Sequence, residues 1–188
     1  MLFNLNRNQT GILSSKSDKM RTIIVTGPEC SGKSTLAQQL SFALDGVYVP
    51  EIARPLLTLT GNRYTFNDLV TIGHYQSALG QSAKGLNKEW VILDTSMLVL
   101  KIWSLYRYNA VDPWIDRVFA QTDAHLWLLC TPLPDWHPDE LRVNQYERDH
   151  LFNRYRDELQ KAGKSFLIVP PGSADERLQQ VLKHTTGL

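Results

Sequence analysis

Short apolar runs alternate along the chain with longer segments in which apolar residues recur every three or four positions. Five of the runs have the length and the β-branched or aromatic content of buried parallel strands, at residues 22–26, 46–50, 90–94, 125–130 and 164–169. The segments between them have helical periodicity, from residues 36–44 to a final helix at 174–184. This alternation predicts an α/β fold, a three-layer sandwich around a five-stranded parallel sheet.

The stretch between the first strand and the first helix carries the most specific signal. It fits the phosphate-binding motif G-x-x-x-x-G-K-[ST] with Gly27, Pro28, Glu29, Cys30, Ser31, Gly32, Lys33 and Ser34, and Thr35 follows. Glycines let the backbone approach phosphate oxygens closely, and successive N–H groups at a helix N-terminus attract anions. Lys33 is expected to reach the β- and γ-phosphates, and Ser34 to ligate Mg²⁺. We therefore predict the fold of P-loop nucleoside triphosphate hydrolases and kinases, binding ATP and Mg²⁺ through these residues.

Acidic residues follow two other predicted strands. Asp94 ends the run at 90–94, as in a Walker B strand, and is expected to hold Mg²⁺ together with Ser34. Glu51 and Arg54 follow the second strand, where open α/β sheets bind ligands, although a surface ion pair that caps a helix is the alternative. Either carboxylate is a candidate base for an acceptor hydroxyl. His74 lies in the helical segment expected beside the substrate.

The segment at residues 131–142 contains three prolines, so neither a helix nor a strand is expected throughout it. It carries Trp136 and Arg142, and Arg148 follows in a charged helical segment at 146–162. We expect these two arginines to close over phosphates as a lid that excludes water. The aromatic residues at 103–114 are interpreted as core in preference to a stacking platform.

Length and composition indicate one soluble domain. The 188 residues suffice for a core without disulfides, and a net charge of +1 argues against a nucleic-acid or membrane partner. Cys30 and Cys130 have no metal or redox spacing and are expected to be reduced thiols of a cytoplasmic protein. Residues 1–20 are expected to form a flexible arm before a domain at 21–188. A homo-oligomer is compatible with the sequence.

Four motifs together resemble the NadR-like P-loop kinases, the ribosylnicotinamide kinase domain of a bacterial NAD-biosynthesis regulator. The resemblance spans residues 21–182 and rests on the P-loop, on Gly73-His74-x-Gln76, on Ile92-Leu93-Asp94-Thr95 and on Trp136-x-x-x-Glu140-Leu141-Arg142. It implies ATP-dependent phosphorylation of the ribose 5′-hydroxyl of nicotinamide riboside. It also implies that Trp136 stacks on the pyridinium ring, that Asp94 faces the ribose or the metal, and that Arg142 faces the phosphates. Arg54, His74 and Gln76 are candidate substrate-binding residues.

The chain departs from that family at two places. The family commonly has glycine where Glu140 stands, and Asp-Thr-Asp where this chain has Asp94-Thr95-Ser96. Family members often carry an upstream adenylyltransferase domain, whereas about twenty residues precede the first strand here, so this chain is not expected to complete NAD synthesis alone. A small-molecule kinase is the leading hypothesis. A P-loop ATPase that acts as a switch on a protein partner is the alternative.

Overall fold

A computed structural model describes residues 20–138 and 144–185. Its single sheet has five parallel strands in the order β2-β3-β1-β4-β5. The central strand pairs with β3 and β4 in a register that sets Val25 opposite Asp94 and Leu128. The strands are β1 (Arg21–Thr26), β2 (Val47–Val49), β3 (Trp90–Asp94), β4 (Leu126–Cys130) and β5 (Phe166–Val169). The predicted five-stranded parallel sheet is confirmed, with strand ends displaced by at most two residues.

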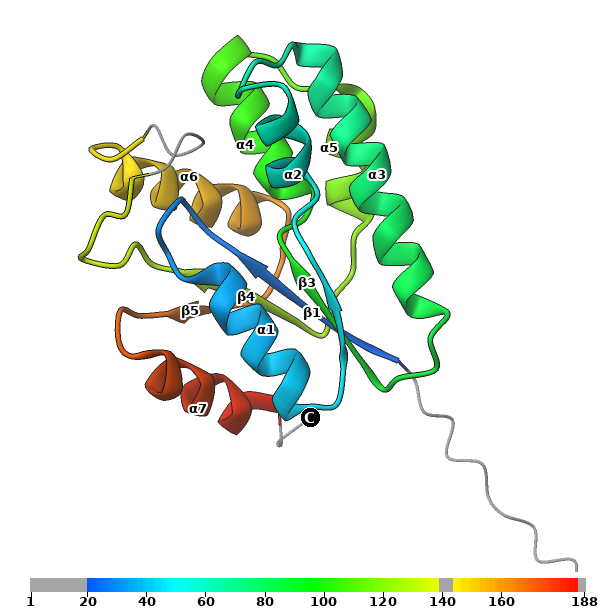
Figure 1. The fold of residues 1–188 in the computed structure, drawn as a ribbon, viewed down its shortest axis with the longest axis vertical. Coiled ribbons are helices and arrows are strands. Elements are labelled where there is room, and N and C mark those ends of the chain that lie inside the picture. The colour runs from blue at the N-terminus through cyan, green and yellow to red at the C-terminus, as the bar shows by residue number, and fades with distance from the viewer. Residues whose placement is uncertain (1–19, 139–143, 186–188) are drawn as a thin grey trace, which may run out of the picture.

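Helices cover both faces of the sheet (Figure 1). One face carries α1 (Lys33–Ala43) and α7 (Ala174–Thr185). The other carries α3 (Phe66–Lys84), α4 (Met97–Tyr108), α5 (Pro113–Gln121) and α6 (Arg148–Lys161). A short helix not resolved by the sequence pattern, α2 (Ala53–Leu59), follows β2 directly. The predicted three-layer sandwich is therefore confirmed.

Each face of the sheet has its own apolar core, because the side chains of a strand alternate between the two faces. Ile23 and Val25 point toward α1 and α7 and are fully buried. Ile24 points the other way and packs in the cluster that contains Leu98 of α4 and Tyr155 of α6. Burial of both faces explains the nearly continuous apolar runs in the sequence.

Local sequence signals fix the starts of three helices. The side chain of Thr65 accepts from the Asp68 amide while Asp68 accepts from the Thr65 amide, a capping box that starts α3. The Ser96 hydroxyl accepts from Leu98 N and thereby caps α4. Asp112 caps α5, with Pro113 in its first turn.

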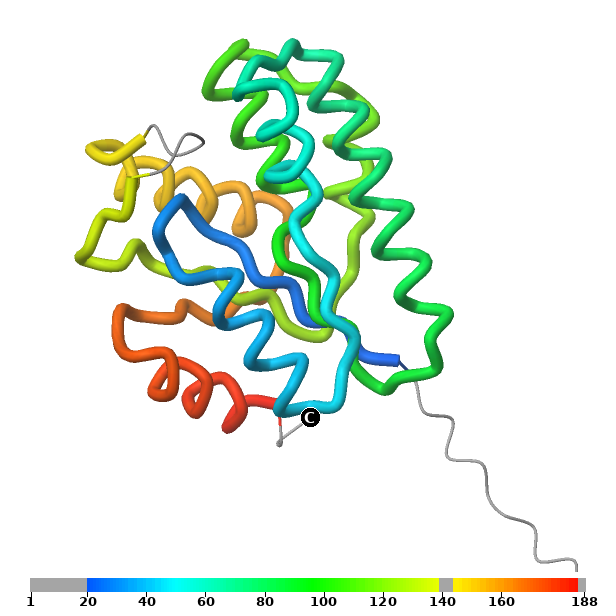
Figure 2. The backbone as a smooth tube through the Cα atoms, in the orientation of Figure 1, coloured from blue at the N-terminus to red at the C-terminus, as the bar shows by residue number. Residues whose placement is uncertain are grey.

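The segment after β4 runs beside the loop between β1 and α1, although the two are about a hundred residues apart (Figure 2). Leu133 N donates to Cys30 O at 2.9 Å. The described part of this segment, residues 131–138, has neither helix nor strand, as its prolines predict. Among the described residues, no helix has the length and apolar content needed to cross a membrane.

Candidate active site

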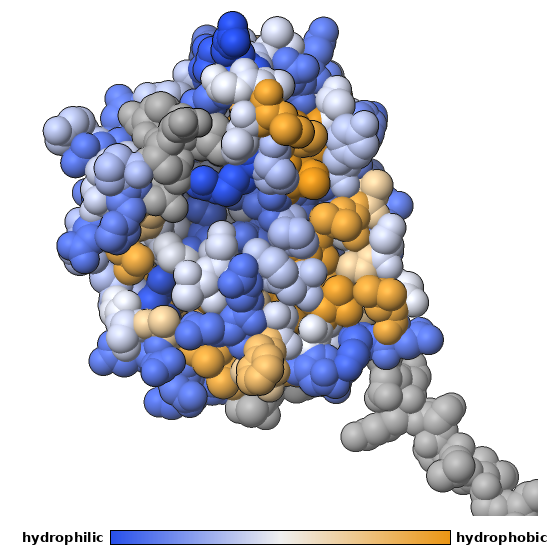
Figure 3. Space-filling model, viewed as in Figure 1, coloured by the Kyte–Doolittle hydropathy of each residue, from blue (hydrophilic) through white to orange (hydrophobic). Residues whose placement is uncertain are grey.

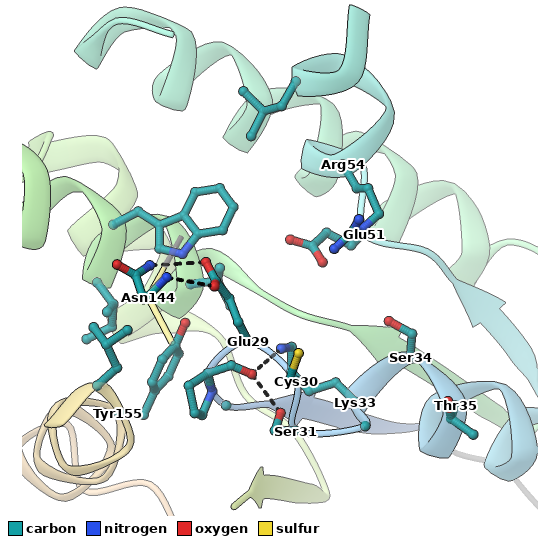
Figure 4. Close-up of a pocket in the computed structure, with 18 residues that line it drawn as sticks. Glu29, Cys30, Ser31, Lys33, Ser34, Thr35, Glu51, Arg54, Asn144 and Tyr155 are labelled. Carbon is teal, nitrogen blue, oxygen red and sulfur yellow. Dashed lines mark hydrogen bonds between the residues drawn. The ribbon is translucent and has the colours of Figure 1, made fainter. Parts of the chain in front are cut away.

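The P-loop connects β1 to α1 in a conformation that only its glycines can supply. Gly27 has φ 138°, and a Cβ there would lie 2.5 Å from the Cys130 carbonyl oxygen of the neighbouring strand. Gly32 is left-handed at φ 68° and directly precedes the first turn of α1. Within the loop, the Lys33 Nζ and the Ser31 hydroxyl each donate to Pro28 O at 2.7 Å (Figure 4). The backbone is thereby folded around the N-terminus of α1, where an anion is favoured.

A cavity of about 160 Å³ opens between the P-loop and the helices of the opposite layer. One side is polar and is formed by the loop itself, with Lys33, Ser34 and Thr35 at its end (Figure 4). The other side combines Glu51 and Arg54 with apolar and aromatic side chains, namely Leu57, Val99, Ile102, Trp103, Leu151 and Tyr155. A phosphate-binding wall therefore faces a wall suited to an organic molecule. In the space-filling view, hydrophilic residues occupy the hollowed centre of this face (Figure 3).

Glu51 projects into this cavity from the turn between β2 and α2, with Arg54 beside it (Figure 4). Burial raises the pKa of the Glu51 carboxyl above its usual value, and the charge of Asp94 raises it further, whereas Lys33 and Arg54 act in the opposite direction. A carboxyl with a raised pKa and a cation nearby is suited to accept a proton at neutral pH.

Gln76 of α3 holds the turn that carries Glu51. Its Nε2 donates to Pro50 O at 3.1 Å, and its Oε1 accepts from Ile52 N at 2.8 Å, so the side chain bridges the two residues that flank Glu51. Gln76 is 7% exposed. Both ends of its amide are thus engaged by backbone, which favours a positioning role over the predicted contact with substrate.

Asp94 lies beside the P-loop, because β3 pairs with β1. Its Oδ2 accepts a hydrogen bond from the Tyr48 hydroxyl at 3.1 Å. Its Oδ1 is buried and has no hydrogen-bond partner among the described residues. A buried carboxylate oxygen without a partner among the described residues has the chemistry that Mg²⁺ requires.

No cluster of three or more His, Cys, Asp or Glu side chains occurs in the described ranges. A Mg²⁺ ion at Ser34 and Asp94 would therefore resemble ions held by one or two protein ligands together with substrate phosphates.

Of the two predicted lid arginines, the structure describes Arg148. The Arg148 guanidinium lies 5.4 Å from the centre of the Trp136 ring and donates through Nη1 to Leu133 O at 2.7 Å. This contact fixes the segment after β4 against α6. Trp136 is not among the described residues that line the cavity. Arg142, Glu140 and Leu141 lie outside the described residues.

His74 is on the exposed side of α3, away from the P-loop. Its ring lies 3.8 Å from that of Trp114, centroid to centroid, in a tilted stack. The structure thus brings Glu51, Arg54 and the P-loop together around one cavity, with Asp94 adjoining it, and leaves His74 apart.

Sequence reasoning missed several residues of the site. Trp103 lines the cavity although its spacing suggested a core position. Asn144 fixes Glu29 of the P-loop through hydrogen bonds of 3.1 Å and 3.3 Å to its carboxylate. Arg177 of α7 donates to the P-loop from below at 2.8 Å. No motif marks these positions, and only the long-range packing of the chain identifies them.

Comparisons with known proteins agree with the fold. A family model described as an AAA domain matches residues 22–177. No curated protein matches the sequence.

Among solved structures, NadR in complex with NR has a TM-score of 0.67 at 16% identity over 80% of this chain and 45% of its own. NadR in complex with NAD and AMP-PNP has a TM-score of 0.69 at 17% identity, over 88% of this chain and 50% of its own. Thymidylate kinase from Candida albicans has a TM-score of 0.66 at 17% identity, over 89% of this chain and 92% of its own. Deoxyadenosine kinase from M. mycoides has a TM-score of 0.60 at 14% identity, over 89% of this chain and 100% of its own.

This chain spans about half the length of the NadR chains that it matches, and nearly all of the two nucleoside and nucleotide kinases. At these identities the similarity concerns the fold, which is the P-loop kinase fold predicted from the sequence. Because the family model extends from β1 into α7, the chain belongs to the AAA-domain family, and within it has a NadR-like kinase fold.

Proposed function

We propose that this protein is an ATP-dependent kinase that transfers the γ-phosphoryl group to a hydroxyl of a nucleoside-type small molecule. The observation that carries the proposal is the two-sided cavity, in which the partly exposed Glu51 carboxyl, with its raised pKa, lies across from the P-loop lysine. A nucleotide switch needs no site for an acceptor beside the phosphates. The apolar and aromatic side supplies space for an organic acceptor.

In the proposed reaction, Glu51 takes the proton of the acceptor hydroxyl as its oxygen bonds to the γ-phosphorus. The bond from the γ-phosphorus to the β–γ bridging oxygen breaks, and ADP leaves. We assign the base to Glu51 and not to Asp94, because Asp94 is bonded to Tyr48 and directs its other oxygen beside the P-loop. Lys33 balances the charge of the transferring group. Ser34 and Asp94 would hold Mg²⁺, which neutralises phosphate charge when bound.

Nicotinamide riboside is the acceptor that we favour. Support comes from the four sequence motifs and from the NadR complex with NR among the structures of similar fold. A cationic pyridinium ring is attracted to an indole face. We assign this contact to Trp103, which lines the cavity, in place of Trp136, whose ring is covered by Arg148.

The test is ADP formation from ATP and Mg²⁺ with a panel of ribosides and deoxyribosides. We expect turnover that requires an acceptor, is highest with nicotinamide riboside and is lost in Glu51→Gln but not in the exposed control Glu89→Gln. Trp103→Ala should raise the KM for nicotinamide riboside about 2- to 30-fold, whereas Trp136→Ala should leave it unchanged. ADP formation independent of any acceptor would support the switch ATPase instead.

A further inference from the structure

An arginine of the last helix lies buried against the underside of the P-loop. Arg177 of α7 is 4% exposed, and its Nη2 donates to Ser31 O at 2.8 Å across a sequence separation of 146 residues. Its Nη1 occupies the space that a Cβ at Gly32 would need. The glycine of the motif therefore makes room for a guanidinium as well as for phosphate.

The charge of Arg177 has no counter-ion in the described ranges. No carboxylate there forms an ion pair with it, and its Nε is buried without a hydrogen-bond partner. The neighbouring carboxylate, Glu176, instead accepts from the amide and hydroxyl of Ser173 at 2.9 Å and 2.8 Å. Burial raises the pKa of the nearby Cys130 thiol to about 11, so that thiol is neutral at physiological pH. A buried cation without a counter-ion is costly, and an anionic ligand would reduce that cost.

A small hollow beside Arg177 has no acidic residue in its described lining, which otherwise consists of Gly32, Thr35, Leu36, Gln39, Leu133, Gly172 and Ala174. The Glu176 carboxylate lies near Gly172 and is engaged by Ser173. The N-terminus of α1 begins at Lys33 on the same side and carries positive partial charge. Three sources of positive potential therefore converge on one loop, namely the guanidinium, the Lys33 ammonium and the helix end.

We propose that Arg177 is a positioning residue of the phosphate site, which holds the Ser31 carbonyl under the loop and supplies buried positive charge beneath the bound phosphates. Its hydrogen bond turns the Ser31–Gly32 peptide so that the carbonyl faces α7, away from the anion. The identification of the anion as ATP rests on the proposed function. The inference that Arg177 supports the binding of a polyphosphate does not.

The test compares Arg177→Lys, which keeps the charge, with Arg177→Gln, which keeps a donor but loses the charge. Arg117→Gln, at an exposed position in α5, is the matched control. Calorimetry measures the binding of tripolyphosphate, ATP and adenosine to the full-length protein. Loss of a nearby unit charge, at an effective dielectric constant of about 20, corresponds to about 10- to 100-fold in affinity, so we expect Arg177→Gln to weaken tripolyphosphate and ATP by that factor. Adenosine binding should not change, and Arg177→Lys should stay closer to wild type than Arg177→Gln.

Several results would overturn the inference. One is an equal affinity of wild type and Arg177→Gln for tripolyphosphate. Another is an equal loss of affinity for adenosine and for ATP in Arg177→Gln, which a merely structural role predicts. If Arg177→Gln does not fold, Arg177→Met is the uncharged variant, and the same order of affinities is required. Polyphosphate binding that depends on Arg177, without transfer to any riboside, would support this inference while refuting the proposed kinase activity.

Discussion

Removal of one hydroxyl group, by Tyr48→Phe, tests the contact that orients Asp94. The Tyr48 hydroxyl donates a hydrogen bond to Asp94 Oδ2 at 3.1 Å, and Oδ1 has no hydrogen-bond partner in the part of the chain that the structure describes. Asp94 is 1% exposed, so water cannot readily replace the lost donor. The phenylalanine ring fills the same space in β2, and the substitution therefore leaves both oxygens of a buried carboxylate unsatisfied.

An unsatisfied buried polar group costs about 1–3 kcal/mol, and more when it is charged. In a protein of this size, each kcal/mol corresponds to about 2–4 °C in Tm. We therefore expect Tyr48→Phe to lower the free energy of unfolding by about 1–3 kcal/mol. Since Asp94 is an expected Mg²⁺ ligand, the variant should also need more Mg²⁺ for half-maximal activity.

The dependence on pH has a definite sign. Burial raises the pKa of Tyr48 to about 12, with the charge of Asp94 as the next cause, from an ordinary value of 10. Because the folded-state pKa is the higher one, the neutral hydroxyl contributes its full stability below about pH 10. That contribution is lost as pH rises from about 10 to 12. The gap between wild type and Tyr48→Phe should therefore be constant near neutrality and close over that range.

Urea denaturation followed by circular dichroism at pH 7 and at pH 9–11 measures this gap. Tyr75→Phe, at a position 58% exposed in α3, is the matched control and should equal wild type. Equal stability of Tyr48→Phe and wild type at pH 7 would refute the reasoning, as would a gap that widens at high pH.

Three further predictions concern the site. Glu51→Gln should reduce kcat by about 10²–10⁴-fold. In the wild type, kcat/KM should fall as the pH drops through the pKa of Glu51, which lies above the ordinary 4.5 of glutamate. Initial rates across pH measure both effects. Gly27→Ala should destabilise the protein by at least about 1–3 kcal/mol and weaken ATP binding. The added Cβ would collide with Cys130 O, and the φ of 138° is unfavourable for alanine. Calorimetric unfolding and ATP titration measure the two effects. Gln76→Met should lower kcat more than it raises the acceptor KM, because Gln76 holds the turn around Glu51; a rise in KM alone would indicate substrate contact instead.

The sequence predicts the sheet well because strands buried on both faces leave continuous apolar runs, as in β3 and β4. Helix α2 is harder to predict, because a proline follows its second residue. Proline is tolerated in the first turn of a helix, where its missing N–H is not needed. In a short segment, however, a proline predicts that no helix forms.

Some residues of the candidate site can be predicted from the sequence, and others cannot. The P-loop and Asp94 are predictable because their chemistry depends on local spacing along the chain. Arg177 is not, since a cation in an amphipathic helix ordinarily points to solvent, and its burial here depends on a P-loop contact 146 residues away. The choice between Trp103 and Trp136 likewise depends on whether α4 or the segment after β4 meets the cavity, which no local pattern encodes.

The most direct test of the kinase proposal follows the phosphoryl group itself. ATP labelled with ¹⁸O in its γ-phosphoryl group is incubated with Mg²⁺, the protein and nicotinamide riboside or another riboside, and mass spectrometry locates the label. We predict labelled phosphate on the acceptor in amounts equal to the ADP formed, and none with Glu51→Gln. Label found only in inorganic phosphate, with the riboside unchanged, would contradict the proposal.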